Sequence, residues 1–266
     1  MELKIIHFYP DLMSLYGSYA NVAVLKRRLE QMGNTVTVEN VDYGQDADLA
    51  GADFLFMGAG TERSQKAALA DFARFGGAVK AAAESGVTML FAGTAMELLG
   101  KSITDADGKI YDGIGLAEFT SVQGKKRFVE DVYGRTDLYP EAVVGFMNKC
   151  SIIEGVETPL LTAVELGFGN DGEGRPEGFH RKNVFASELT GPILVKNPRL
   201  LDAVVTAICV HRGEALPAEF PKDHWTEDGY AITAQQLGLR CGSKSSNIPE
   251  SPVTAYSHRT SCFFSR

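Results

Sequence analysis

Through roughly its first 100 residues, the chain alternates short apolar runs with amphipathic helical stretches. The apolar runs are Leu3–Phe8, Asp53–Met57 and Val87–Phe91, and each has the length of a buried strand. Between them, Asn21–Met32 and Gln65–Glu84 carry apolar residues at helical spacing. Strands and helices in this order favour a doubly wound sheet, because parallel strands are joined by crossover helices. We therefore expect an α/β fold with a mainly parallel sheet flanked by helices.

Glycine-bearing or polar turns follow the three buried runs, at residues 9–18, 58–64 and 92–96. In an open parallel sheet, ligands bind at the carboxyl ends of the strands. We therefore expect these three turns to meet at one edge and to form the functional site.

The second half of the chain changes in character. Short apolar runs lie between turn residues and predict antiparallel strands, and a helix is expected at Pro198–His211. We assign residues 1–212 to one domain and residues 213–266 to a C-terminal extension. In that extension, Trp225–Leu239 is consistent with a helix, whereas the Ser-rich segment after Arg240 is expected to be disordered, so the extension is partly disordered. The expected antiparallel strands are Leu116–Val122, Val143–Met147 and Leu161–Glu165.

Charge and cysteine content exclude several functions. A net charge of −8 and a pI near 5.2 argue against nucleic-acid binding, which needs a basic face. No apolar run approaches the roughly 20 residues that span a bilayer, and the start of the chain is no signal peptide, so we expect a cytoplasmic protein. The four cysteines have neither the CxxC nor the His spacing of a metal site, so no metal or cofactor is predicted. They are Cys150, Cys209, Cys241 and Cys262, and Cys209 is interpreted as a buried helix residue.

Two strand-to-helix turns could carry chemistry. In Gly58-Ala59-Gly60-Thr61, small residues let backbone N–H groups face a phosphate or an oxyanion, although a tight turn that simply needs glycine is an equal alternative. The turn Phe91–Glu97 has the shape of a nucleophile elbow, in which a strained residue at a strand end points into a cleft. The middle position of this elbow is Gly93, and the hydroxyl that follows it belongs to Thr94.

In the order of its elements and motifs, the chain resembles the class I glutamine amidotransferases of the cobyric acid synthase (CobB/CobQ) type, and among these the amidotransferase-like subunits of lipid II isoglutaminyl synthases. The resemblance spans about residues 1–212 and does not include the C-terminal extension. The matching stretches are Met1–Phe8, Leu15-Tyr16 with Asn21, Phe56–Gln65, Leu99–Lys101, Val144–Phe146, Gly167–Asn170 and Gly191–Asn197.

The resemblance implies ammonia production from glutamine. In the family a cysteine thiolate at the elbow attacks the side-chain amide, a histidine on a later strand is its base, and backbone N–H groups stabilise the oxyanion. The ammonia passes to a Mur-ligase-like ATP-dependent synthetase, with which the subunit forms a heterodimer. The acceptor in that pathway is the α-carboxylate of D-glutamate in the peptidoglycan stem peptide.

This sequence departs from the family at the catalytic positions. Gly93 stands where the family has the cysteine, and Thr190 stands where it has the histidine before Gly-Pro. No shift of register restores the thiol, because no cysteine precedes Cys150. Glu97 replaces a family glutamine and is expected to add negative charge to the pocket. We therefore predict no catalytic residue.

Features that suit ligand binding remain. Arg127 falls where the family holds the α-carboxylate of glutamine, and its alternative is a solvated basic turn. Arg127 and the loop Gly58, Ala59 and Gly60 are the predicted ligand-binding residues, for glutamine or a related small amino acid. His7 and His180 match family positions outside the catalytic pair and are interpreted as structural histidines with satisfied hydrogen bonds. Cys150 has no elbow pattern and is not expected to be a nucleophile.

Three functions follow from these observations. The leading hypothesis is an amidotransferase-like subunit without glutaminase activity, which acts with a Mur-ligase-like partner in lipid II amidation. The second is an active glutamine-hydrolysing subunit of lipid II isoglutaminyl synthase or of a cobyrinate-type amidation. The third is a free-standing small-molecule-binding module, since a fold does not fix a function.

Overall fold

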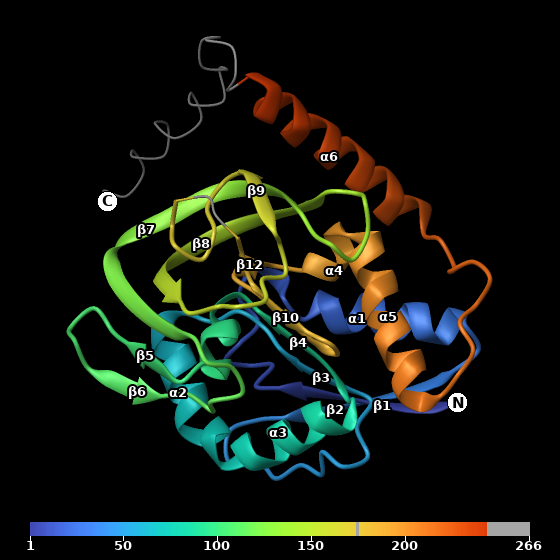
Figure 1. The fold of residues 1–266 in the computed structure, drawn as a ribbon. Coiled ribbons are helices and arrows are strands. Elements are labelled where there is room, and N and C mark those ends of the chain that lie inside the picture. Colours follow the sequence, from blue (N-terminus) through green and yellow to red (C-terminus); the bar gives the residue numbers. More distant parts are fainter. Residues whose placement is uncertain (174–175, 244–266) are drawn as a thin grey trace, which may run out of the picture.

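A six-stranded sheet forms the centre of the molecule (Figure 1). The computed structural model describes residues 1–173 and 176–243. Five of the strands run parallel, and β10 alone pairs antiparallel, with β11. The expected mainly parallel sheet is therefore confirmed. In spatial order the strands are β10 (Phe179–Arg181), β11 (Val184–Ser187), β4 (Thr88–Ala92), β3 (Phe54–Met57), β1 (Glu2–Phe8) and β2 (Thr35–Val41).

Helices cover both faces of this sheet, and each face has its own apolar core. On one face lie α1 (Ala20–Gln31), α4 (Ile193–Lys196) and α5 (Pro198–Arg212), as expected from the helical spacing of the first and last of these. On the other lie α2 (Glu62–Phe72) and α3 (Gly76–Ser85). Because both faces are buried, the central strands are apolar on both sides, and every residue of β3 and β4 is buried.

The long helix expected at Gln65–Glu84 is broken, and that prediction was wrong. The chain turns through a 3-10 segment, Ala73–Phe75, between α2 and α3. This turn brings the Phe75 ring to within 5.3 Å of the Phe8 ring, measured between centroids, and Phe75 is 6% exposed. Burial of this aromatic side chain against the sheet offsets the loss of regular helix. The spacing of apolar residues in the sequence does not reveal this contact.

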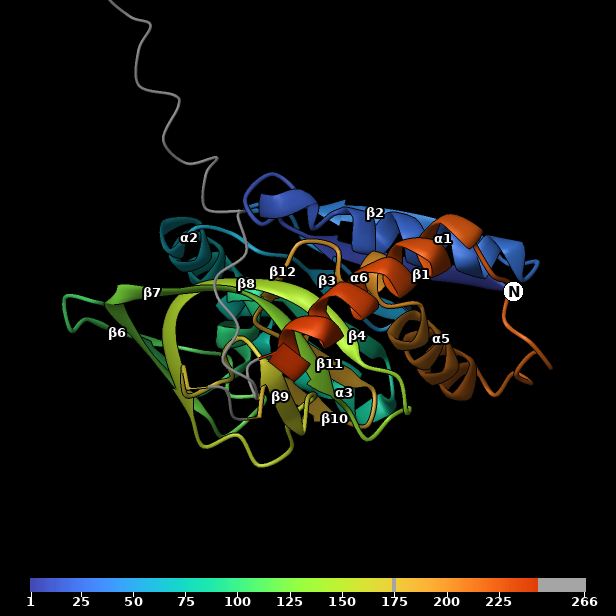
Figure 2. The ribbon, with the colours of Figure 1, turned by 90° about the horizontal axis from the view of Figure 1, so that it is seen from above.

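A second sheet, mostly antiparallel, arches over the carboxyl edge of the first (Figures 1 and 2). Its two long strands continue well beyond the expected runs. A register shift between Gln123 and Phe128 interrupts their pairing, so the basic residues there form a bulge inside a strand rather than a free turn. The strands are β12 (Leu189–Thr190), β8 (Val143–Glu154), β7 (Thr120–Arg135), β5 (Ser102–Thr104) and β6 (Ile110–Asp112), and β9 (Ala163–Leu166) pairs with β7.

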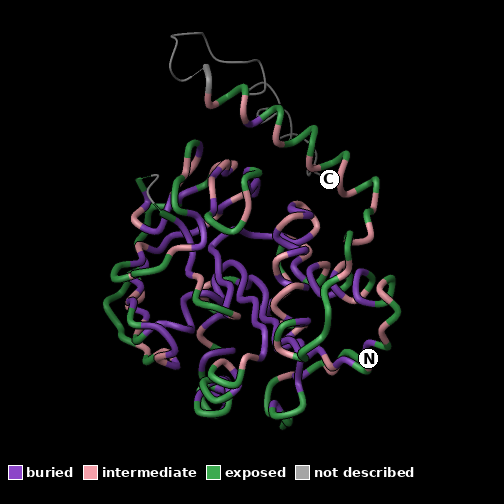
Figure 3. Tube along the Cα trace, turned by 45° about the vertical axis from the view of Figure 1, so that its right-hand side comes forward, coloured by how far each residue is buried: buried purple, intermediate pink, exposed green. Residues whose placement is uncertain are grey.

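The C-terminal extension contains the helix α6 (His224–Ser243), so the helix expected at Trp225–Leu239 is confirmed. It runs along the outside of the molecule, and Figure 3 shows most of its surface exposed. It is attached through Leu237, which packs with Val144 and Leu166, and through Arg240, which forms ion pairs with Glu130 and Asp131. The expectation of disorder for the last residues concerns 244–266, which lie outside the described residues. Within residues 1–173 and 176–243, no helix has the length and apolar character needed to cross a bilayer.

Candidate functional site

Three loops meet above the carboxyl ends of the parallel strands and form a pocket of about 250 Å³. This confirms that the turns after β1, β3 and β4 share one edge. The second sheet closes the other side, with one residue from β7, one from β8 and one from β12. The lining residues are Leu15, Tyr16, Ala59, Gly60, Thr61, Glu62, Thr94, Arg127, Asn148 and Thr190.

A chain of polar side chains spans the mouth of this pocket. The Arg127 guanidinium donates to Glu62 Oε1 at 2.8 Å and to Asn148 Oδ1 at 2.8 Å. Asn148 Nδ2 in turn donates to the Tyr16 hydroxyl at 2.8 Å. Tyr16 has φ = +60°, a left-handed conformation that is costly for a non-glycine residue, and residues with such strain are enriched at functional sites.

Glu62 is ionised in this arrangement. Partial burial pushes the pKa of its carboxyl upward, but its own backbone N–H and the charged hydrogen bond from Arg127 outweigh burial, so the pKa is lowered. Glu62 is also the first residue of α2, where the helix dipole favours negative charge. The Arg127 guanidinium thus already binds a carboxylate, which comes from its own chain.

The backbone N–H groups of the glycine loop also have internal partners. Gly60 N–H donates to Thr94 Oγ1 at 3.0 Å, and the Thr94 hydroxyl donates back to the Gly60 carbonyl at 3.0 Å. Ala59 N–H donates to Ser18 Oγ at 3.3 Å. An oxyanion in this pocket would therefore have to displace side chains of the protein before it could use these donors.

Gly93 lies at the elbow with φ = +62° and begins the 3-10 helix η3 (Gly93–Leu99). A Cβ atom at this position would come to 2.6 Å from Ala59 Cβ. Because carbon atoms pack at about 3.5 to 4 Å, no side chain fits at this position while Ala59 is opposite. The elbow accordingly holds glycine for two reasons, the backbone conformation and the space.

Thr190 lies across the pocket and has no basic atom. Its hydroxyl donates to the Phe146 carbonyl at 3.1 Å, which ties β12 to β8. The polar side chains that line the pocket are hydroxyls, one amide and the Glu62–Arg127 ion pair. This set can hold a small zwitterion by charge and hydrogen bonds, but it pairs no nucleophile with a base.

A family model agrees with this architecture. Residues 4–198 match the CobB/CobQ-like glutamine amidotransferase domain. The chain belongs to this family.

Two relatives of known function and one solved structure are similar to the chain. Subunit GatD of a lipid II isoglutaminyl synthase (glutamine-hydrolyzing) from Staphylococcus aureus is 30% identical over 226 residues, which is 84% of this chain and 89% of that protein. The protein of the same name from Streptococcus pneumoniae is 33% identical over 209 residues, 77% of this chain and 80% of that protein. The structure of PurLQS from Thermotoga maritima superimposes with a TM-score of 0.52 at 12% identity, covers 80% of this chain and 100% of that one, and supports the fold alone.

Within this amidotransferase-like domain, the pocket brings together five of the residues singled out from sequence: Ala59, Gly60, Thr94, Arg127 and Thr190. Gly58 and Gly93 lie beneath the lining and are buried. Gly58 has its own packing reason to be glycine, since a Cβ there would meet Met13 O at 2.4 Å.

The expectation that Glu97 adds charge to the pocket was wrong. Glu97 does not line the pocket but lies in the protein interior, where it is 1% exposed and accepts hydrogen bonds from Ser121 and Gln123. Burial raises the pKa of this carboxyl and so favours its neutral form. The spacing along the elbow does not show on which side of a 3-10 helix a residue falls, and this produced the error.

The environments of Cys150 and Cys209 do not favour a reactive thiolate. Cys150 Sγ lies 3.4 Å from Glu62 Oε1, and burial followed by the Glu62 charge raises the pKa of the thiol to about 12. A thiol with such a pKa stays protonated and is a poor nucleophile. Cys209 is 2% exposed in α5, as expected. In the part of the chain that the structure describes, no cluster of metal-ligating side chains occurs.

The two structural histidines differ from each other. His180 Nε2 donates one hydrogen bond to the Lys182 carbonyl at 3.0 Å, and its ring packs at a tilt against the Phe185 ring. His7 is buried, and its Nε2 has no hydrogen-bond partner within the described residues, so the interpretation of a satisfied histidine was wrong for this atom. Burial lowers the pKa of His7 to about 4 and keeps it neutral.

Proposed function

We propose that this chain is the amidotransferase-like subunit of a two-subunit amidating complex and that it does not hydrolyse glutamine itself. The observation that carries the proposal is the state of the elbow: Gly93 leaves no room for a side chain, and Thr94 occupies the Gly60 N–H group. Both features remove what covalent attack on an amide requires, namely a nucleophile and an open oxyanion site.

The relatives suggest the pathway. Their names describe subunits of lipid II isoglutaminyl synthase, and this chain matches them over at least 77% of its length. We propose a Mur-ligase-like ATP-dependent synthetase as partner and the D-glutamate α-carboxylate of the peptidoglycan stem peptide as acceptor. In this proposal the complex works in the cytoplasm, and the chain acts as a structural subunit or as a sensor of a small amino acid.

For the sensor role, we propose that Arg127 holds the α-carboxylate of glutamine or a related amino acid, beside the loop Gly58–Gly60. Glu62 competes with that carboxylate for the guanidinium. Glu62→Gln should therefore strengthen glutamine binding about fivefold, a free-energy gain of ~1 kcal/mol for a half-exposed pair. Isothermal titration of the variant and of Glu62→Gln/Arg127→Ala measures this. The double variant should not bind, and an unchanged or weaker affinity of Glu62→Gln would exclude Arg127 as the carboxylate site.

Reconstitution with the Mur-ligase-like subunit from the same genome tests the proposal as a whole. We expect a stable complex that amidates its acceptor when ammonium chloride is the nitrogen source and gives no product with glutamine. The matched control replaces this chain by a family member with the elbow cysteine, which should support both nitrogen sources. Amidation from glutamine by the complex would contradict the proposal, and failure to form a complex would favour a free-standing binding module.

A further inference from the structure

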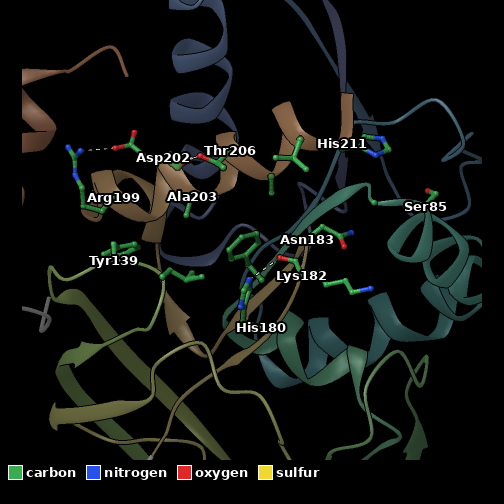
Figure 4. Close-up of a pocket in the computed structure, with 15 residues that line it drawn as sticks. Ser85, Tyr139, His180, Lys182, Asn183, Arg199, Asp202, Ala203, Thr206 and His211 are labelled. Atoms are coloured by element: carbon green, nitrogen blue, oxygen red, sulfur yellow. Dashed lines mark hydrogen bonds and ion pairs between the residues drawn. The ribbon is translucent and has the colours of Figure 1, made fainter. Parts of the chain in front are cut away.

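A cavity of about 800 Å³ lies at the opposite end of the central sheet from the pocket described above. One wall is α5, and the other walls are the loop at Leu138-Tyr139, the β10–β11 hairpin and the turn Ser85-Gly86 before β4 (Figure 4). We call this cavity the α5 groove. It shares no lining residue with the candidate site, so the proposed amidotransferase-like function does not account for it.

The middle of the α5 groove is apolar. Ala203, Ala207 and Val210 of α5 face it from one side and Phe185 of β11 from the other, and Val210 is 68% exposed. The volume falls in the range of small-molecule sites, which are concave and mostly apolar with a few polar groups that fix orientation. The body of an occupant would therefore be apolar.

Tyr139 supplies one such polar group. Its hydroxyl is buried and has no hydrogen-bond partner among the described residues. Burial is the main factor that raises the pKa of this phenol, so it keeps its proton and can donate a hydrogen bond to an acceptor. A buried polar atom without a partner is rare in native structures and costs stability, which a ligand acceptor would offset.

Lys182 supplies the second polar group. Figure 4 shows that it lies in a different part of the groove from Tyr139. In the part of the chain that the structure describes, its ammonium has neither an ion pair nor a hydrogen bond, whereas the groove's one carboxylate, Asp202, is paired with Arg28 and Arg199. The charged side chains that line the groove are therefore neutralised by partners except for Lys182, which leaves a positive charge there.

The backbone of Lys182 adds an independent observation. This residue occupies the two-residue loop of the β10–β11 hairpin with φ = +57°, where glycine is the favoured residue. A lysine is strained in that conformation, and residues that keep such strain cluster at ligand sites. The hairpin is thus built with a cation at a position where folding alone would favour glycine.

We propose that the α5 groove binds an elongated small molecule with an apolar body and one anionic head group, a carboxylate or a phosphate, with Lys182 at the head group and Tyr139 donating to an acceptor at the other end. The proposal does not depend on the proposed function of the amidotransferase-like pocket.

Three probes of equal chain length test this on the full chain by isothermal titration: decanoate, monodecyl phosphate and decanol. We expect saturable one-to-one binding of one or both anions, at least fivefold tighter than that of decanol, and the comparison of the two anions identifies the head group. Ala207→Trp fills the apolar middle and should weaken the binding of every probe at least tenfold. Ala231→Trp, at an exposed position of α6, is the matched control and should bind as the wild type does.

Lys182→Gly separates a ligand role from a structural one. Because glycine suits the left-handed conformation, this variant should melt at the same temperature or higher, yet it should lose about the fivefold preference for the anion over decanol. Several results would overturn the proposal: no saturable binding of any probe, equal affinity for decanol, an unchanged anion preference in Lys182→Gly, or a concentration-dependent dimer that buries the groove in place of probe binding.

Discussion

Gly93→Cys should lose about 2 to 5 kcal/mol of unfolding free energy, because a non-glycine residue at positive φ costs ~1 to 2 kcal/mol and overpacking costs ~1 to 3 kcal/mol. The overpacking comes from Ala59, whose Cβ would lie 2.6 Å and whose Cα would lie 3.2 Å from the new Cβ, and the Cβ contact is the closer of the two. Ala59→Gly in the same chain should therefore restore about 1 kcal/mol or more, as a coupling energy in a double-mutant cycle. Urea unfolding under reducing conditions measures the unfolding free energy of the wild type, the two single variants and the double variant.

The control for this cycle is Gly77→Cys. Gly77 is exposed in α3, and a Cβ there meets nothing within 4 Å, so this variant should be as stable as the wild type or more stable. If Gly93→Cys unfolds at the same urea concentration as Gly77→Cys, the steric account of the elbow is wrong.

The same geometry predicts what restores chemistry. Gly93→Cys with Thr190→His should not release ammonia from glutamine, because Ala59 still crowds the thiol and Thr94 still holds the Gly60 N–H group. Adding Ala59→Gly and Thr94→Gly opens both sites, and this fourfold variant is expected to show turnover that the double variant lacks. Turnover in the double variant would show that Ala59 and Thr94 do not block glutamine hydrolysis.

Stability should fall by about 3 kcal/mol between pH 4.5 and pH 8 through Glu177 alone. This side chain is 0% exposed, and burial raises the pKa of its carboxyl to about 7, although the Glu188 N–H and the Ser187 hydroxyl both donate to it. A carboxyl whose folded-state pKa exceeds its unfolded value of 4.5 contributes stability that is fully present below that value and is lost as the pH rises through about 7. Glu188 is also buried, and burial raises the pKa of its carboxyl in the same direction.

Glu177→Gln removes this titration and keeps the size of the side chain. Urea midpoints measured from pH 4.5 to pH 8 should therefore be flatter for the variant than for the wild type, with the variant more stable at pH 8. Glu154→Gln, an exposed carboxylate at the end of β8, is the control and should follow the wild-type curve. A variant curve as steep as that of the wild type would exclude Glu177 as the titrating group.

The sequence predicted the sheet and the edge at which the site lies, because both follow from local patterns. Apolar runs such as Asp53–Met57 and Val87–Phe91 read as buried strands, and the turns after them meet as parallel topology requires. The break near Phe75 was missed, since it depends on which aromatic side chain reaches the sheet, a tertiary contact.

Several residues of the site were not predicted from the sequence. Asn148 lies in β8, and the alternation of residues along a strand does not mark it as a site residue. It bonds to Arg127 because the two long strands β7 and β8 pair across the bulge. Glu62 was visible beside the glycine loop, but its pairing with Arg127 requires contact between residues 65 positions apart. The Thr94–Gly60 bond likewise joins two loops that only the sheet brings together.

These missed contacts also explain how the departures at Gly93 and Thr190 fit together. Ala59, Thr94 and Glu62 each take up space or a donor that a glutamine-hydrolysing pocket would keep open. The proposed loss of glutaminase activity would therefore involve more than the two side chains at Gly93 and Thr190.

Ammonia release from glutamine labelled with ¹⁵N in the side-chain amide measures whether this chain hydrolyses glutamine. The purified chain is assayed alone and with its Mur-ligase-like partner, beside Arg127→Ala, and labelled ammonia is counted. We expect no release above the buffer background in any sample, while the partner still turns over added ammonium. Release that requires Arg127 would reveal a nucleophile in this pocket and would contradict the account.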